Sequence, residues 1–244
     1  MEERGIIFNT EMVRAILDGR KTQTRRIVKS PAKTMQENGC KVIDYRPLGD
    51  KWYRNYEFSM RNESGVWGDY TREQFLAKCP FGKIGDRLWV RETFALLGNE
   101  DGVCVDWNDG IVYDEKEAAI IYKASCEQKD GDYGLWSIPD DSDWKPHTDN
   151  HKYNGTWRPS IHMLRWASRI LLEITDVRVE RIKDASDNDF KAEGYPLERE
   201  LTGGSLDSFL WFRHFWDSVS KPDCNYEINP WVWVIEFKLL EMTN

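Results

Sequence analysis

Four residues with reactive or charged side chains follow one another closely near the start of the chain. Lys21, Thr24, Arg25 and Arg26 bring an amine, a hydroxyl and two guanidinium groups into six residues. Such groups could hold a phosphate through charge-assisted hydrogen bonds, or work on a polar group beside one. A solvated basic turn would show the same pattern. The residues alone leave both interpretations open.

A short helix is predicted to position this basic segment. Four apolar residues recur at helical spacing and share one face: Met12, Val13, Ile16 and Leu17. Asn9 or Thr10 is the expected N-cap, with Glu11 near the positive end of the helix dipole. Gly19 is expected to end the helix in the left-handed conformation. The helix would therefore lead directly into the basic residues.

Composition narrows the class of protein. The net charge of −8 argues against a protein that coats nucleic acid, although 14–33 contains seven basic residues and one acid. The five cysteines are scattered without a CxxC pair, so neither a zinc site nor a disulfide framework is indicated. No apolar run approaches the length of a membrane span and no signal peptide is visible, so we expect a cytoplasmic protein. The sequence has no P-loop, dinucleotide-binding glycine motif or HExxH, and we expect no cofactor. Some of the twelve tryptophans could stack on bases.

The element pattern favours a mixed α+β fold in which short strands build a compact β-barrel. Strands are predicted at 5–8, 87–94, 170–179 and 230–239, with a bend or bulge at Asp176. Helices are predicted at 187–193, capped by Ser186 and ended by Gly194, and at 206–219. Two stretches rich in Gly, Asp and Asn, at 30–78 and 97–157, are interpreted as insertions into a single domain over 1–244. The first has the pattern of a hairpin, and the second contains one strand-like piece at 118–123.

The sequence also predicts which residues of these elements are buried and whether one polar loop could bind a metal. Glu92 is expected to share the face of Leu88 and Val90 and to need an Arg or Lys partner. Two apolar stripes are expected in the core: Leu206, Phe209, Leu210, Phe212, Phe215, Trp216 and Val219 on the helix, and Trp231, Trp233, Ile235, Phe237 and Leu239 on the last strand. His147 and His151, beside aspartates at 140–143, could suggest a metal, but their irregular setting favours a solvated loop.

An ordered set of motifs resembles the ASCH domain, a branch of the PUA-like superfamily. Segment 19–25, GRKTQTR, resembles its GxKxxTxR signature. The strand at 85–90, the helix end at 192–194 and the strand at 233–237 fit the same pattern. Across nearly the whole chain the sequence is similar to phage and prophage ASCH proteins, with weaker likeness in the two insertions.

The resemblance implies a PUA-like mixed β-barrel with short flanking helices and a cleft beside the first helix. Members bind RNA or modified bases, and one bacterial branch removes the acetyl group from N4-acetylcytidine without a metal. That branch's Lys, Thr and Glu correspond to Lys21, Thr24 and Glu193, and Glu92 is a rival for the carboxylate. The expected partner is therefore RNA or a nucleoside or nucleotide, with no membrane.

The chemistry of amide hydrolysis gives these residues separate roles. Thr24 is a weak nucleophile unless a neighbour accepts its proton, and Lys21 could do so if burial and nearby cations lower its pKa. Glu193 could orient the substrate amine or move a proton. The remaining candidates are expected to contact the substrate: Arg20, Arg25 and Arg26 at a phosphate, Glu92 as the alternative carboxylate, and Trp89 and Trp157 as stacking faces that could equally be core.

Three functions remain open from the sequence. The first is binding of RNA or a modified nucleoside with amidohydrolase activity on an N-acylated base. The second is a reader with the same pocket and no catalysis, in which the three residues form a buried ion pair and hydrogen bond that position the base. The third is a phage assembly or interaction protein that uses the two insertions as contact surfaces.

Overall fold

The computed structural model describes residues 1–29, 43–98, 103–108, 110–125 and 157–242. The chain is of the mixed α+β class, which confirms the predicted class. It divides into two compact units, which we describe separately. Unit 1 comprises Met1–Glu2, Arg20–Asp86 and Glu173–Lys238, and unit 2 comprises Glu3–Gly19, Arg87–Leu172 and Leu239–Asn244. A closed barrel and a single domain over 1–244 stay predictions.

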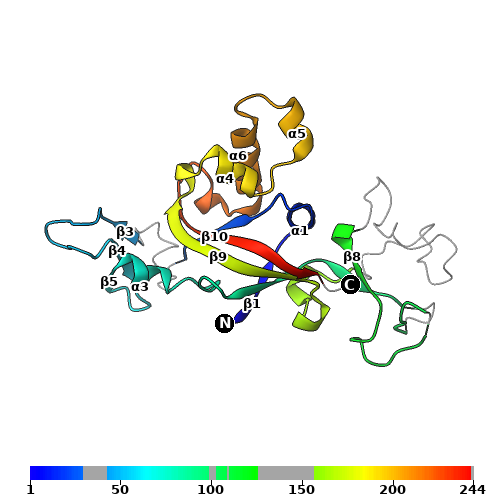
Figure 1. Ribbon diagram of the computed structural model, residues 1–244. Coiled ribbons are helices and arrows are strands. Elements are labelled where there is room, and N and C mark those ends of the chain that lie inside the picture. Colours follow the sequence, from blue (N-terminus) through cyan, green and yellow to red (C-terminus); the bar gives the residue numbers. More distant parts are fainter. Residues whose placement is uncertain (30–42, 99–102, 109, 126–156, 243–244) are drawn as a thin grey trace. The chain divides into compact units, whose positions relative to one another are not determined.

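Three adjacent strands form the main sheet of unit 1, in the order β9, β10, β2. They are β2 (Gln23–Ile27), most of β9 (Ile170–Arg181) and most of β10 (Trp231–Met242). Figure 1 shows β9 and β10 as long neighbouring strands. β10 runs antiparallel to β2, with Val234 opposite Arg25 and Ile235 opposite Thr24. β9 is one continuous strand, but its burial pattern shifts phase between Ile174 and Val177, as a bulge near the predicted position would produce.

Strand β10 is buried on both faces, which corrects the prediction of a single apolar face. Val232 and Val234 are as fully buried as Ile235, whereas Leu239 is 41% exposed. The even-numbered valines pack into a cluster with α6 (Asp207–Val219), and Trp233 stacks on Phe75 at a centroid distance of 5.3 Å. Because layers cover both sides of the strand, period-two alternation is lost.

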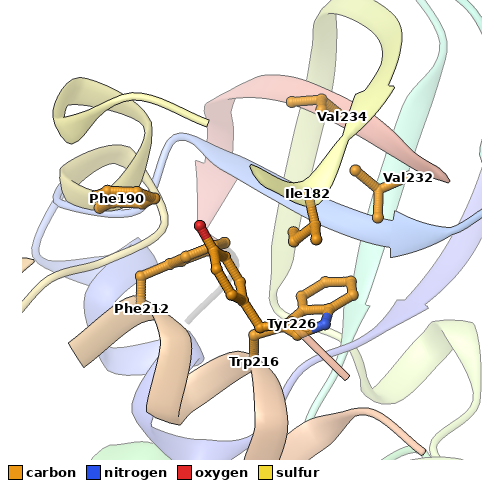
Figure 2. Close-up of a cluster of buried hydrophobic side chains, with 7 residues drawn as sticks. All are labelled: Ile182, Phe190, Phe212, Trp216, Tyr226, Val232 and Val234. Carbon is orange, nitrogen blue, oxygen red and sulfur yellow. The ribbon is translucent and has the colours of Figure 1, made fainter. Parts of the chain in front are cut away.

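The cluster under α6 is the hydrophobic centre of this side of unit 1 (Figure 2). Seven buried residues form it: Ile182, Phe190, Phe212, Trp216, Tyr226, Val232 and Val234. The predicted stripe on the helix is only partly right, because Leu206, Leu210 and Val219 are more than half exposed. The helix thus buries one narrow edge through Phe212 and Trp216, and its outer leucines contact solvent.

The remaining elements of unit 1 flank this sheet. They are β3 (Ile43–Tyr45), β4 (Phe58–Arg61), β5 (Trp67–Tyr70), α3 (Arg72–Leu76), η5 (Ile182–Asp184), α4 (Asp187–Ala192), α5 (Leu197–Thr202) and η6 (Pro222–Cys224). β3, β4 and β5 form an antiparallel three-stranded sheet, so the predicted insertion contains more than a hairpin. One face of that sheet packs inward through Phe58, whose ring lies 4.5 Å from Phe75 and 6.1 Å from Trp231.

Unit 2 contains the helix that precedes the basic segment. Its elements are β1 (Glu3–Ile7), α1 (Thr10–Leu17), β6 (Arg87–Arg91), β7 (Phe94–Leu96), β8 (Ile120–Tyr122), η1 (Lys123–Ser125), η3 (Ser160–His162), η4 (Arg165–Ala167) and the start of β9. β1 pairs with β6 in parallel, and β7 with β8 antiparallel. The predicted strand at 87–94 is therefore broken after Arg91. The polar segment with His147 and His151 lies outside the described residues.

The predicted ends of α1 are confirmed. The Asn9 side chain accepts a hydrogen bond of 2.8 Å from the backbone of Met12, and Gly19 has a φ of +73°. Since an N-cap satisfies an otherwise unpaired backbone donor, Asn9→Ala should lower the free energy of unfolding by about 1 kcal/mol. Asn9→Asp, which keeps the acceptor, should cost far less. Chemical denaturation of the two variants checks this, and equal costs would contradict it.

Candidate functional site

Lys21 and Glu193 meet in the interior of unit 1, although they are far apart in sequence. Nζ of Lys21 lies 2.7 Å from Oε2 of Glu193 and donates a second hydrogen bond, of 2.9 Å, to the Glu193 carbonyl. The exposed fractions of the two side chains are 0% and 2%. Of the two candidate carboxylates, Glu193 is the one that binds this lysine.

Local sequence signals position Glu193. Helix α4 begins at the Ser186 cap, which forms a reciprocal capping box with Asp189, and Glu193 is its C-cap residue. Gly194 follows with a φ of +104°, a conformation that favours glycine. The backbone N–H of Thr22 donates to the Ala192 carbonyl at 2.9 Å, and the helix end is thereby held beside the basic segment.

Arg25 occupies the other half of the same carboxylate. Its Nη1 donates to Oε1 of Glu193 at 3.1 Å, and its Nη2 lies 2.6 Å from Glu180 and 3.0 Å from Asp189. The guanidinium also lies 5.7 Å from the centre of the Phe212 ring, so the polar centre is continuous with the hydrophobic cluster. Glu193 therefore bridges two buried cations, and neither of its oxygens is left without a partner.

The environment lowers the pKa of Lys21. Burial is the main cause, and the positive charges of Arg26 and Arg25 act in the same direction, while the contact with Glu193 opposes them. Desolvation disfavours a charged ammonium, whereas a carboxylate at hydrogen-bond distance favours it. The lysine is thus closer to the neutral amine than a surface lysine would be.

Thr24 faces the other side of β2. Its hydroxyl accepts a hydrogen bond of 2.9 Å from Nη1 of Arg26, and its side chain is fully buried. Neighbouring residues of a strand point to opposite faces, so Thr24 and Arg26 share the face of Ile235, away from Arg25. The structure therefore forms two groups at β2: Lys21, Arg25 and Glu193 on one side, and Thr24 with Arg26 on the other.

Arg20 supports the helix end that carries Glu193. Its Nη1 donates to the carbonyl of Gly194 at 2.9 Å and to that of Tyr195 at 3.3 Å. These contacts hold the turn after α4 against the start of the basic segment. The sequence predicts that Arg20 binds substrate. In this structure its guanidinium instead holds the protein's own backbone in position.

Sequence reasoning missed an outer ring of polar residues around Arg25. Gln23 donates to the Asp189 carbonyl at 2.8 Å and to its carboxylate at 3.1 Å. Arg178 pairs with Asp189 at 2.9 Å, with Glu180 at 3.3 Å and also with Glu236. The sequence did contain a signal for these residues. Arg178 and Glu180 are charged residues on an otherwise buried strand, where charged side chains need partners.

Asp189 gives the site a testable pH dependence. Burial alone would raise the pKa of this carboxyl, but hydrogen bonds from Ser186 and Gln23 and the charge of Arg25 hold it well below the ordinary 3.8. A lowered pKa stabilises the fold above 3.8, and that contribution is lost as the pH falls below it. Asp189→Asn should therefore cost most stability at neutral pH and progressively less below pH 3.8, which urea titrations across pH would measure. A cost that is constant with pH would contradict this.

The other candidates lie in unit 2. Both oxygens of Glu92 are bound by Arg169, at 2.9 and 3.1 Å, which confirms the expected arginine or lysine partner. Burial raises the pKa of the Glu92 carboxyl, and Arg169 opposes the shift. Trp89 and Trp157 pack, partly buried, against two hydrophobic clusters, and a Cβ added at Gly5 would lie 2.7 Å from Cζ2 of Trp89. Each ring also lies beside a cation of unit 2: the Arg91 guanidinium is 5.5 Å from the centre of the Trp89 ring, and Nζ of Lys123 is 5.9 Å from that of Trp157.

Comparisons with known proteins add no assignment: no family model, curated protein or solved structure matches the chain. In the part of the chain that the structure describes, no group of three His, Cys, Asp or Glu side chains could hold a metal ion. Within the same residues, no helix combines the length and apolar character needed to cross a membrane.

Proposed function

We propose that the chain is an ASCH-like protein of the PUA-like type that binds RNA or a nucleoside or nucleotide, with a modified base as ligand, at β2 of unit 1. The observation that carries the proposal is the 2.7 Å contact between Lys21 and Glu193. The ASCH resemblance places this amine at the site, with Glu193 or its rival Glu92 as the carboxylate, and the contact favours Glu193. The chain brings them together through α4 across more than 170 residues of sequence.

The arrangement suits recognition because its inner charges are already paired. Lys21, Arg25 and Glu193 satisfy one another and need no ligand, so they act as a rigid support for β2. Arg26 is partly buried, and burial lowers the pKa of its guanidinium; it donates a hydrogen bond to the Thr24 hydroxyl. A phosphate that binds Arg26 would leave that hydroxyl available to a donor or acceptor of the base.

Amidohydrolase activity on an N-acylated base is the second candidate, and the lowered pKa of Lys21 favours it. In this reaction water splits the amide into a carboxylic acid and the free amine of the base. A threonine nucleophile must lose its proton to a base, for which a neutral lysine is suited. Binding is placed first because Thr24 is bonded to Arg26 on the face opposite Arg25, and hydrolysis would require Lys21 to reach it.

The other parts of the proposal follow from the same resemblance. They are a closed barrel in a single domain, a phage or prophage origin and a place in the bacterial cytoplasm. A phage assembly or interaction protein is the competing role, in which residues of the two insertions would contact a virion protein.

A screen of modified and unmodified nucleosides and nucleotides, read by thermal shift and mass spectrometry, tests the proposal. A ligand at a hundred times its Kd should stabilise the wild-type chain by about 2.7 kcal/mol. The stabilisation by a nucleotide should be lost in Arg26→Gln, and the stabilisation by either kind of ligand should be reduced in Thr24→Val. Release of acetate from N4-acetylcytidine, absent in Thr24→Val and Lys21→Met, would establish the hydrolase. No stabilisation by any ligand, together with capture of a virion protein, would select the assembly role instead.

A further inference from the structure

Exposed aromatic side chains are concentrated in one short part of unit 1. Among the described residues, seven large aromatic side chains are classed as exposed, and five of them lie between positions 45 and 67. They are Tyr45 (45%), Trp52 (80%), Tyr53 (38%), Tyr56 (45%) and Trp67 (40%). Burying aromatic side chains is strongly favourable, so five of them left exposed in one part of the chain indicate a binding surface, whereas a single exposed ring does not.

The loop between β3 and β4 is held in a defined conformation. The carboxylate of Asp50 accepts hydrogen bonds from the backbone of Trp52 at 2.8 Å and of Tyr53 at 3.0 Å. Gly49 and Arg54 close the loop through a backbone hydrogen bond of 2.9 Å, and both have positive φ, +84° and +52°. The aromatic side chains are therefore presented by a fixed turn, which reduces the entropy lost on binding.

Lysine and arginine side chains lie beside the aromatic rings of this region. Nζ of Lys51 lies 5.2 Å from the centre of the Trp52 ring, and the Arg46 guanidinium lies 3.4 Å from that of Tyr53. On β4 and β5, the Arg61 guanidinium lies 4.7 Å from Trp67. Aromatic faces interleaved with Lys and Arg are the pattern by which proteins hold unpaired bases and the phosphates between them.

We propose that this loop binds single-stranded nucleic acid through its tip, residues 51–56, with sequence KWYRNY. All six residues are exposed, and they comprise three rings, two cations and one amide, with no aliphatic side chain. The rings stack on bases, the cations bind phosphates, and the Asn55 amide reaches base edges. Lys51 and Arg54 form no ion pair within the described residues, so both charges are available to a polyanion. A single strand is favoured over a duplex because stacking requires unpaired bases.

This surface is separate from the centre at Lys21 and does not depend on it. The loop extends from the three-stranded sheet, whereas Lys21 and Glu193 lie between β2 and the end of α4. A protein that recognises a modified base at β2 would gain from a second contact that holds the strand carrying that base. Either surface could nevertheless bind without the other, so separate variants can test them.

Fluorescence anisotropy with a labelled twelve-nucleotide oligouridine tests the loop on the full chain. We expect Trp52→Ala to weaken binding by about ten-fold, since one stacked base is lost. Trp107→Ala is the matched control, because Trp107 is 65% exposed in unit 2, and it should bind as wild type does. The double variant Lys51→Gln/Arg54→Gln should flatten the slope of log affinity against log salt by about 1.4, the value for two phosphates on a single strand.

The outcomes separate this surface from the proposed nucleoside site. Trp52→Ala should leave the thermal shift given by a free nucleotide unchanged, whereas Arg26→Gln should abolish that shift and retain most oligouridine binding. Wild-type affinity in Trp52→Ala, tighter binding to a duplex of equal length, or equal losses in Trp52→Ala and Trp107→Ala would overturn the proposal. Capture of a protein that depends on Trp52, without oligouridine binding, would assign the loop to a protein partner instead.

Discussion

Replacing Glu193 by glutamine should lower the free energy of unfolding of unit 1 by about 3–5 kcal/mol at neutral pH. The reason is that Lys21, with a fully buried side chain, would lose the carboxylate 2.7 Å from its amine. Arg25 would suffer less, because it keeps contacts of 2.6 Å with Glu180 and 3.0 Å with Asp189. Urea denaturation of the two proteins measures the difference.

The size of this loss should depend on pH in a definite direction. Glu193 is the contact that raises the pKa of Lys21 against the effect of burial, so its removal lowers that pKa further. As the pH rises, the neutral amine becomes easier to form, and the penalty of a buried unpaired charge falls. Above neutral pH, where this lysine can lose its proton, a cost of Glu193→Gln that increases with pH would therefore contradict our description of the centre.

Two controls test whether the broken Lys21–Glu193 pair causes the loss of stability in Glu193→Gln. Glu227 also pairs with two cations, Lys183 at 3.1 Å and Arg213 at 2.8 Å, but it is 57% exposed, so Glu227→Gln should cost far less than Glu193→Gln. The double variant Lys21→Met/Glu193→Gln should cost less than the sum of the single variants, because neither partner is left alone. Additive costs would show that the two residues do not stabilise each other.

Phe212→Ala is expected to have a second large effect, a loss of about 3–5 kcal/mol. Phe212 is fully buried, its ring stacks on Phe190 at 4.7 Å, and Tyr226 lies 6.5 Å away edge-on (Figure 2). The substitution leaves a cavity in the cluster that also packs against the Arg25 guanidinium. Thermal and chemical denaturation should both report the loss.

Leu210 is the matched control on the same helix. It belongs to the same predicted apolar stripe as Phe212, yet it is 54% exposed. Leu210→Ala should therefore change stability by no more than about 0.5 kcal/mol. Similar costs for the two substitutions would mean that α6 buries the whole stripe, contrary to the structure.

Elements defined by local signals could be predicted from the sequence. The Asn9 cap, the stop at Gly19, and the Ser186 and Gly194 ends of α4 depend on a few neighbouring residues, and all four are confirmed. The burial of Glu92 followed from strand alternation, and its partner had to be basic. These predictions held because side-chain chemistry fixes each feature within one turn or strand.

Features that depend on distant layers could not be predicted. Whether Leu210 is buried depends on what covers α6, and burial of both faces of β10 depends on Trp233 meeting Phe75 from helix α3. For the site, the residues allowed Lys21, Thr24 and Arg25 to be grouped, but only the folded chain shows that Thr24 faces away from Arg25. Glu180 and Asp189 were missed because tertiary contacts alone select the partners of a buried arginine.

The most direct test of the proposed function is isothermal titration of nucleosides and nucleotides into the wild-type chain and Arg26→Gln, with Trp52→Ala as the control. Our account predicts saturable one-site binding to wild type and Trp52→Ala, with at least about ten-fold weaker binding of nucleotides to Arg26→Gln, since a charge-assisted contact to phosphate is lost. Absence of binding to wild type, or equal affinity in Arg26→Gln, would contradict it.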